Sequence, residues 1–184
     1  MTLKLDRAGL TSSPELLQVF LRLIREDSEF LRGAYPNFDK WLRRSVLPGI
    51  EKGERTIIVE QRDGHSVGLL ILKHTANERK LCTLRVRPEF EYRGLGVRLF
   101  NTAFEVLDTH RPLLSVSEGA LPKFSKIFEH FGFACEAAYE GLYLPHVQEF
   151  SFNGVLKGDS VDRKGHPAEQ ELKRARTSPS FALA

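Results

Sequence analysis

The sequence is poor in cysteine, and its two cysteines stand far apart. Cys82 and Cys135 are the only ones in 184 residues, and neither belongs to a closely spaced pair. A small secreted scaffold held by disulfides would need more of them, so that class is excluded. Both stand in apolar surroundings, and we expect buried free thiols. A reducing compartment, the cytoplasm, is therefore the expected location.

Long apolar runs and metal-binding patterns are also missing. No segment approaches the roughly 20 apolar residues of a membrane-spanning helix, and charged residues interrupt residues 1–10, so no signal-peptide core is visible. The six histidines show neither metal-ligand spacing nor a visible Ser-His-Asp arrangement. We therefore predict no membrane partner and no metal.

An excess of charge of one sign is the third absence. The formal net charge is only +3, which excludes a strongly basic nucleic-acid binder on charge alone. Basic groups at Arg43 and Arg44 and at residues 173–176 leave RNA or an acidic protein open as partners. A solvated helix face and a solvated tail are the favoured interpretation.

The composition is that of a globular domain, with 41% hydrophobic and 28% charged residues. Apolar residues recur periodically up to about Gly154, and the sequence beyond it is mainly polar and charged. We predict a folded domain at residues 1–154 and a polar, disordered tail at 155–184, with a short helix at about 167–176.

Two helices are expected first. Ser13 is a plausible cap for a helix that Gly33 closes, and Asn37 for a second helix that Pro48 and Gly49 interrupt or end. Three strands joined by tight turns then predict an antiparallel meander at residues 55–61, 67–74 and 80–86. The remaining elements are expected in the order helix, strand, helix, strand, strand, at residues 94–106, 113–116, 122–131, 133–139 and 143–152. The predicted fold class is α+β, a mixed and mostly antiparallel twisted sheet flanked by helices.

The loop between the third meander strand and the next helix carries two glycines. Gly94 and Gly96 leave backbone amides uncovered at a helix N-terminus, where anions are favoured, and Arg93 and Arg98 add positive charge. The pattern fits a diphosphate cradle, although a tight turn explains it too. Val97 follows where a Walker loop needs lysine, and the third glycine of a dinucleotide fingerprint is missing.

In this loop the sequence resembles the GNAT superfamily of acyl-CoA N-acyltransferases. The family motif of Gln or Arg, two residues, Gly, one residue, then Gly or Ala falls on residues 91–96, and the preceding strand matches at Leu84, Val86 and Pro88. A helix ending in Gly-Phe matches residues 128–133, and the closing strand resembles residues 149–154. The likeness spans about residues 3–154. Residues 38–44, 67–73 and 81–84 are similar to a bacterial subgroup found beside PIN or ASCH domains.

The resemblance implies a GNAT-like fold and transfer of an acetyl group from acetyl-CoA, the acyl-donor substrate, to a primary amine. The acceptor is left open among protein lysines or N-termini, small amines and aminoacyl-tRNA, and a homodimer is one open oligomeric state. The strand backbone would pair with the pantetheine arm, and the loop amides would hold the diphosphate. The residues implied in acetyl-CoA binding are Leu84, Val86, Glu91, Tyr92, Arg93, Gly94, Leu95, Gly96, Val97 and Arg98.

Two departures from the family pattern keep a second function open. Glu91 replaces the usual Gln or Arg, which is unfavourable beside a diphosphate unless it points away or pairs with Arg87 or Arg93. Phe128 stands where the family often has a tyrosine that protonates the departing thiolate. The alternative is a non-catalytic acyl-CoA-binding regulatory module or an interaction protein.

Three residues are candidates for the catalytic roles. Glu118 follows the strand expected to flank the cofactor and is the candidate base, Ser117 is a candidate donor to the thiolate, and Tyr143 is expected on the last strand. Each has an ordinary interpretation as well: a solvated loop carboxylate, a turn residue and a half-buried strand tyrosine.

Overall fold

A computed structural model describes residues 1–156 and the residue pair 166–167. The chain divides into two compact units, Met1–Thr109 and His110–Ala184. Each unit contains a four-stranded antiparallel sheet with helices packed on it. The α+β class, with mostly antiparallel strands flanked by helices, is therefore confirmed.

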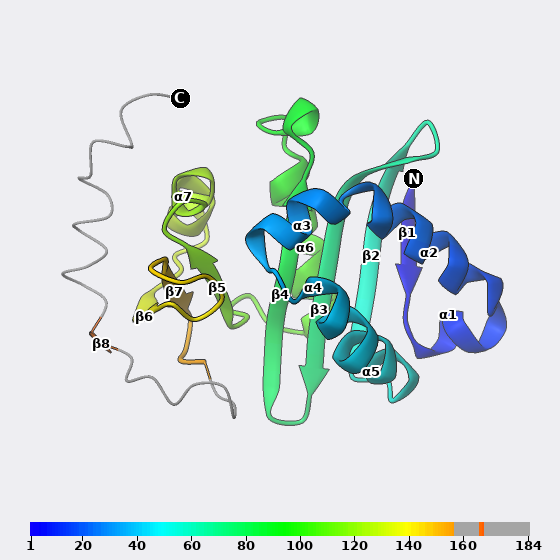
Figure 1. The fold of residues 1–184 in the computed structure, drawn as a ribbon, viewed down its shortest axis with the longest axis horizontal. Coiled ribbons are helices and arrows are strands. Elements are labelled where there is room, and N and C mark those ends of the chain that lie inside the picture. Colours follow the sequence, from blue (N-terminus) through cyan, green and yellow to red (C-terminus); the bar gives the residue numbers. More distant parts are fainter. Residues whose placement is uncertain (157–165, 168–184) are drawn as a thin grey trace. The chain divides into compact units, whose positions relative to one another are not determined.

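The sheet of the first unit has the strand order β1-β2-β3-β4 (Figure 1). The strands are β1 (Thr2–Leu5), β2 (Arg55–Arg62), β3 (His65–Thr75) and β4 (Glu78–Val86). Asp63 and Gly64 both have positive φ, the backbone form that suits a two-residue hairpin turn between twisted strands. The predicted meander is confirmed. The short strand β1 was missed, although Leu3 and Leu5 alternate with polar residues, because only four residues carry the pattern.

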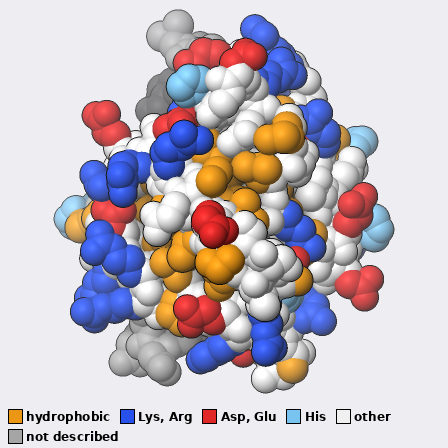
Figure 2. Space-filling model, turned by 90° about the vertical axis from the view of Figure 1, so that its right-hand side faces the viewer, with side chains coloured by type: hydrophobic (Ala, Val, Ile, Leu, Met, Phe, Trp, Pro, Cys, Tyr) orange, Lys and Arg blue, Asp and Glu red, His pale blue; other side chains and the backbone are white. Residues whose placement is uncertain are grey.

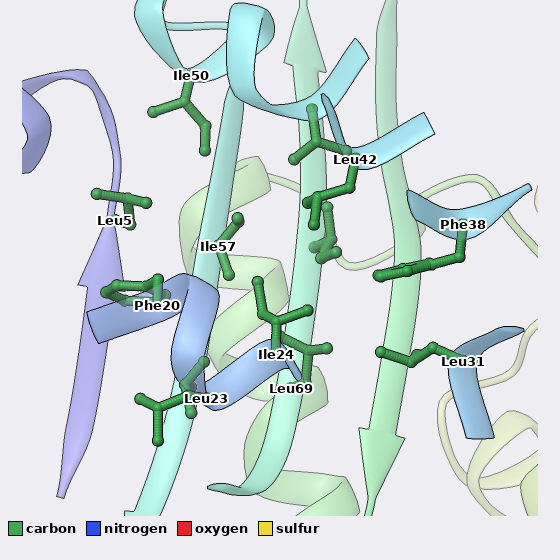
Figure 3. Close-up of a cluster of buried hydrophobic side chains, with 13 residues drawn as sticks. Leu5, Phe20, Leu23, Ile24, Leu31, Phe38, Leu42, Ile50, Ile57 and Leu69 are labelled. Carbon is green, nitrogen blue, oxygen red and sulfur yellow. The ribbon is translucent and has the colours of Figure 1, made fainter. Parts of the chain in front are cut away.

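One face of this sheet carries a series of short helices, shown in front of the strands in Figure 1. They are α1 (Arg7–Ser12), α2 (Glu15–Glu26), α3 (Ser28–Ala34), α4 (Phe38–Trp41), the π-helical turn η1 (Leu42–Val46) and α5 (Leu47–Glu51). Figure 3 shows their apolar side chains meeting those of the strands, with Phe20, Leu23 and Ile24 of α2 against Ile57 and Leu69. All five are buried, and each contributes about 1.5–3 kcal/mol by leaving water.

The predicted helix from Ser13 to Gly33 is wrong in its boundaries. The helix breaks at Asp27 (φ −102°, ψ 8°), which separates α2 from α3, and Gly33 lies inside α3. Ser13 is not a cap either, since its hydroxyl hydrogen bonds to the Glu15 carboxylate at 3.1 Å and Pro14 takes the capping position. Asp27 is buried and bonded to residues of other elements, and these tertiary bonds outweigh helical continuity.

The second predicted helix is confirmed in place but differs in form. Asn37 precedes α4 without a side-chain capping bond. Pro48 has no N–H to donate to a helical carbonyl, and the preceding turn widens so that the Leu47 N–H bonds to the Leu42 carbonyl five residues back. Gly49 lies inside α5 rather than after it. A Cβ there would stand 2.7 Å from the Arg55 side chain, which explains why glycine occupies the position.

The other face of the sheet is covered by α6 (Leu95–Leu107), which confirms the helix predicted after Gly94. The one-turn helix η2 (Pro88–Phe90) lies in the loop between β4 and α6. Leu95 and Leu99 approach Gly68 of β3 so closely that a Cβ there would lie 3.0 Å from the Leu99 side chain. The contact brings the first turns of α6 close to the start of β3.

The second unit has the strand order β5-β7-β6-β8. Its elements are β5 (Leu114–Ser117), α7 (Leu121–His130), β6 (Cys135–Glu140), β7 (Gln148–Phe152) and β8 (His166–Pro167). Phe128 of α7 packs on Phe152 with ring centroids 4.5 Å apart. Because strand side chains alternate, Ser117 and its cross-strand partner Glu149 face away from the side that carries Phe152.

The remaining sequence predictions concern the two cysteines and the residues after Gly154. Cys82 and Cys135 are half-buried rather than buried, and Cys82 packs against the apolar core of the first unit. Leu156 is 7% exposed and packs with Ala137 and Tyr139. Residues 157–165 and 168–184, with most of the predicted tail and its short helix, lie outside the described residues. The division at Gly154 stays a prediction.

Figure 2 views the molecule from the side on which α1, α2 and β1 lie in Figure 1. Apolar side chains gather near the centre of this view, and Lys and Arg side chains lie around its margin. Among the partly buried apolar side chains of these elements are Leu3, Leu10 and Leu16, which pack against the core below. Within residues 1–156, no helix is long and apolar enough to cross a membrane.

Candidate functional site

The strand β4 presents an unpaired edge in its own sheet. The Arg87 N–H donates to the Val67 carbonyl at 3.1 Å, so at this position the chain bonds towards β3. Successive residues of a strand point their N–H and C=O groups to opposite sides. The backbone groups of Leu84 and Val86 therefore point away from β3, towards the outer edge of the sheet. An extended ligand with amide groups can add to such an edge as a further strand.

The loop that leaves this edge holds a strained residue. Tyr92 has φ 58°, in the left-handed region, and its side chain is 90% exposed. The other non-glycine residues of positive φ in residues 1–156 are Asp63, Asp108, His146 and Asn153, types that tolerate this region. A bulky residue held there without packing is costly, and such strain concentrates at ligand-binding loops.

The helix α6 begins without a side chain that caps its first amides. Its N-cap is Gly94 in the left-handed conformation (φ 78°), with no side-chain capping bond and no acidic residue in the first turn. The first intrahelical bond runs from the Arg98 N–H to the Gly94 carbonyl at 3.1 Å. The helical pattern thus gives no acceptor to the N–H groups of Leu95, Gly96 and Val97. A Cβ on Gly94 would meet nothing within 4 Å, so an anion can approach.

The two arginines of the loop differ in what they offer an anion. Arg93 is exposed. Arg98 is held at 3.2 Å by the carboxylate of Glu60 on β2, whose side chain is only 7% exposed. Its charge is therefore partly offset by Glu60, although the Arg98 side chain is itself 58% exposed. The expectation that Arg98 adds positive charge to the cradle stays a prediction, and its backbone N–H lies at the helix start.

Glu91 was expected to point away or to pair with Arg87 or Arg93. Its negative charge acts on Arg85 of β4, where it favours the charged guanidinium. Burial lowers the pKa of Arg85 from its ordinary value, and the charges of Asp27 and Glu91 oppose that shift. The acidic residue at the first motif position therefore acts electrostatically on a guanidinium of the neighbouring strand.

An ionic cluster beside the β4 edge was missed by sequence analysis. The Asp27 carboxylate accepts from the Ser66 hydroxyl at 3.1 Å and from Arg87 Nε at 3.3 Å, while Glu26 accepts from Arg87 at 3.0 Å. Arg85 Nε lies 3.7 Å from Asp27 Oδ1, and its guanidinium carbon stands 3.6 Å from the centre of the Phe30 ring. The available hint was one charged residue between the apolar Leu84 and Val86.

The catalytic candidates lie in the second unit. Ser117 ends β5, half-buried, opposite Glu149 of β7. Glu118 closes the same ladder: its N–H donates to the Gln148 carbonyl at 2.8 Å, and its carboxylate accepts from the Gln148 N–H at 3.2 Å. The structure brings these two residues together at the end of β5. It gives the Glu118 carboxylate a structural partner.

Tyr143 lies in the connection between β6 and β7, 41% exposed, and not on a strand. The predicted strand at 143–152 is therefore wrong at its start, since β7 begins at Gln148 after a turn in which the Gly141 N–H bonds to the Val147 carbonyl. Phe128 is 3% exposed within an aromatic cluster that includes Phe124 and Phe133. It is a packing residue.

Sequence analysis also missed the buried carboxylate of Glu149, 4% exposed on β7 between Ser117 and Tyr139 of the flanking strands. The closing-strand pattern named this residue without marking it as buried. Within residues 1–156, no group of three or more His, Cys, Asp or Glu side chains is arranged to hold a metal ion.

Comparison by sequence gives no match, either to a family profile or to a curated protein. Comparison of structures gives many. A spermidine N-acetyltransferase chimera from Vibrio cholerae and hSSAT matches with a TM-score of 0.55 and 20% identity, over 83% of this chain and 92% of the other. The PaiA N-acetyltransferase from Thermoplasma acidophilum, solved in complex with coenzyme A, matches with a TM-score of 0.52 and 17% identity, over 82% and 96%.

Nourseothricin acetyltransferase matches with a TM-score of 0.49 and 18% identity over 55% of this chain, which spans 65% of that protein's length. None of these comparisons supports the subgroup found beside PIN or ASCH domains. The shared architecture of the first two structures covers most of both chains in each case. By structural similarity, the chain has the GNAT acetyltransferase fold.

Proposed function

We propose that this protein is an N-acetyltransferase that transfers the acetyl group of acetyl-CoA to a primary amine, in the cytoplasm. The observation that carries the proposal is the open N-terminus of α6, capped by Gly94 at φ 78° and reached directly from an edge strand. The helix N-terminus offers amide donors to a diphosphate. The strand edge offers backbone groups to an extended ligand with amide groups. The fold and the coenzyme A complex of the Thermoplasma acidophilum protein support the same assignment.

The chain's own groups would act mainly by binding and orientation. The N–H groups of Leu95, Gly96 and Val97 would hold the diphosphate, and the outward groups of Leu84 and Val86 would fix the pantetheine arm. Fixing the donor against an amine converts an encounter of two molecules into a reaction within one complex, which lowers the barrier by several kcal/mol (about 7–11 kcal/mol at best).

The reaction itself is a direct transfer. The amine nitrogen attacks the thioester carbonyl, the C–S bond breaks, and the amine's proton passes to a base while the thiolate leaves. A lysine-like amine has a pKa of about 10.4 and must lose a proton first, whereas a thiol of pKa about 8.5 leaves readily without a strong acid. The burial of Phe128 is therefore compatible with turnover. Ser117, Glu118 and Tyr143 stay predictions for the remaining roles.

Calorimetric titration with acetyl-CoA tests the binding part of the proposal. The wild type is expected to bind, and a Gly94→Glu, Gly96→Glu variant to lose binding. Gly53→Glu is the matched control, because Gly53 also has positive φ (75°) but precedes β2, at the opposite end of the sheet from the β4–α6 loop. No binding by a folded wild type would overturn the proposal.

Thiol release then tests catalysis. The wild type is incubated with acetyl-CoA and a panel of small amines and lysine peptides. It is expected to release free coenzyme A faster than the same mixture without protein. Binding without release for any acceptor would favour the second candidate, a non-catalytic acyl-CoA-binding module. The absence of a titratable group at the buried Phe128 is the observation that keeps that candidate in view.

A further inference from the structure

The Val86 carbonyl, one of the outward groups of the β4 edge, already has a partner within the protein. Arg85 Nη1 donates to this carbonyl at 2.8 Å. The Arg85 side chain is only 10% exposed, and the half-exposed ring of Phe30 covers its guanidinium. The guanidinium therefore takes one of the two lone pairs of this carbonyl and competes with a ligand N–H that would approach Val86.

The same guanidinium leaves another of its donors unsatisfied. Arg85 Nε is buried and has no hydrogen-bond partner among the described residues. Asp27 Oδ1 lies 3.7 Å away, so a movement of less than about 1 Å would bring the two within hydrogen-bond distance. A buried unsatisfied donor is costly, and a carboxylate oxygen that already accepts from Arg87 can accept a second bond.

We propose that Arg85 is a positioning residue that competes with the acyl donor for the Val86 carbonyl and so sets the affinity of the β4 edge for the pantetheine arm. The inference rests on the proposed function. In the free protein Arg85 holds the carbonyl. When the donor binds, its amide N–H takes the carbonyl, and Arg85 turns to Asp27, which satisfies Nε.

The affinities of two ligands distinguish binding at the β4 edge from binding at the N-terminus of α6. Acetyl-CoA carries the pantetheine arm, whereas 3′-phosphoadenosine 5′-diphosphate carries the nucleotide and diphosphate without it. Arg85→Met removes the competing donor and keeps the apolar contact with Phe30. It is expected to bind acetyl-CoA several-fold more tightly than wild type, up to about tenfold, because the competing hydrogen bond (about 1.4 kcal/mol) is gone, although the bond to Asp27 that offsets part of it in the bound state is gone as well. Affinity for 3′-phosphoadenosine 5′-diphosphate should stay unchanged.

Asp27, which would accept the Arg85 guanidinium when the donor is bound, is expected to give the opposite result. Asp27→Asn weakens the acceptor that receives Arg85 in the bound state, so acetyl-CoA affinity is expected to fall about threefold or more. Arg79→Met is the matched control, since Arg79 also lies on β4 and donates to a backbone carbonyl, that of Thr75, at the other end of the strand. It should leave the affinity for both ligands unchanged. Opposite shifts at Arg85 and Asp27 are not expected from a general loss of stability.

The outcomes separate this inference from the proposed function. If wild type binds neither ligand, the proposed function fails. If wild type binds both and Arg85→Met leaves acetyl-CoA affinity unchanged or weaker, the competition is refuted and the function stands. Should Arg85→Met fail to fold, Arg85→Lys takes its place, because the shorter ammonium keeps the charge near Asp27 but loses the forked group that reaches Val86. Unchanged or weaker acetyl-CoA binding by Arg85→Lys refutes the competition equally.

Discussion

Two helix N-termini of the first unit solve the same problem in different ways. At α1 the Asp6 carboxylate accepts from the Gly9 N–H at 2.9 Å, so the protein supplies its own anion. At α6 the cap is Gly94, with no side-chain bond and no acidic residue in the first turn. Exposed amides and the helix dipole favour negative charge at both ends. The start of α1 is closed by the chain's own carboxylate, whereas the start of α6 is left without one, and we propose that it is kept for a ligand.

An absent cap alone does not distinguish a binding site. The helix α7 also has no side-chain cap, but Pro122 in its first turn removes one amide donor, and its N-cap Ala120 has ordinary right-handed geometry. At α6 the open cap coincides with a left-handed glycine, a strained Tyr92 and an edge strand leading in. The combination, rather than any one feature, marks the candidate site.

The largest loss of acetyl-CoA affinity is expected when a carboxylate is placed at the N-terminus of α6, as Asp6 is at that of α1. Gly94→Asp places a carboxylate at the helix start in a backbone conformation that Asp tolerates. Repulsion of the diphosphate should weaken acetyl-CoA binding about a hundredfold, or about 2.7 kcal/mol. Gly94→Asn has the same shape without the charge and should lose less than about tenfold by calorimetry. Equal losses in the two variants would contradict an anion site.

The next prediction compares two alanine variants, to distinguish the effect of backbone strain on stability from the effect on acetyl-CoA binding. Gly94→Ala and Gly53→Ala both force a Cβ into the left-handed region, and each should reduce the free energy of unfolding by about 1–2 kcal/mol in denaturant titrations. Only the first should also weaken acetyl-CoA binding. Weaker binding by both variants would show that loss of binding reports stability rather than the site.

A smaller effect is expected at the closed helix. Asp6→Ala removes the cap of α1 and should cost about 1 kcal/mol of stability without changing acetyl-CoA affinity. The bond from the Gly9 N–H, with that to Lys4, lowers the pKa of Asp6 below its ordinary value of 3.8. Asp6 therefore stabilises the fold fully above that value, and this contribution is lost as the pH falls through the lower pKa of the folded state.

Denaturation of wild type and Asp6→Ala across the range from pH 5 to about pH 2 measures this contribution. The difference in unfolding free energy should shrink as the pH falls. A constant difference would show that Asp6 acts on stability through something other than its charge.

The smallest effect is expected at Arg98. Its guanidinium is held by Glu60, so Arg98→Gln should change acetyl-CoA affinity by less than about threefold in folded protein. Arg93→Gln is the comparison, because Arg93 is exposed at the loop, and its removal should cost more than that of Arg98. A larger loss at Arg98 would show that the ion pair opens when the ligand binds.

The periodic parts of the fold were predictable from sequence. The meander of β2, β3 and β4 and the helix after Gly94 follow from alternating or helical apolar patterns and from turn residues. The break at Asp27 and the widened turn before Pro48 were not, because the break depends on ion pairs with Arg85 and Arg87, which are distant in the chain. The widened turn depends on how the helix accommodates the missing N–H of Pro48.

The candidate site divides in the same way. Gly94 could be named from sequence, since a glycine at a strand-to-helix junction fits an open anion site as well as a tight turn. The bond from Arg85 to the Val86 carbonyl could not, because it depends on which backbone groups face the sheet edge. Tyr143 was placed on a strand because the apolar pattern around it continues through the turn that precedes Gln148.

The most direct measurement of the central claim follows backbone amides by NMR during titration with acetyl-CoA. The account predicts that the N–H resonances of Leu95, Gly96 and Val97 move strongly as their protons gain acceptors, while that of Gly9, already bonded to Asp6, stays in place. A folded protein in which the α6 amides do not move, or move no more than Gly9, would contradict it.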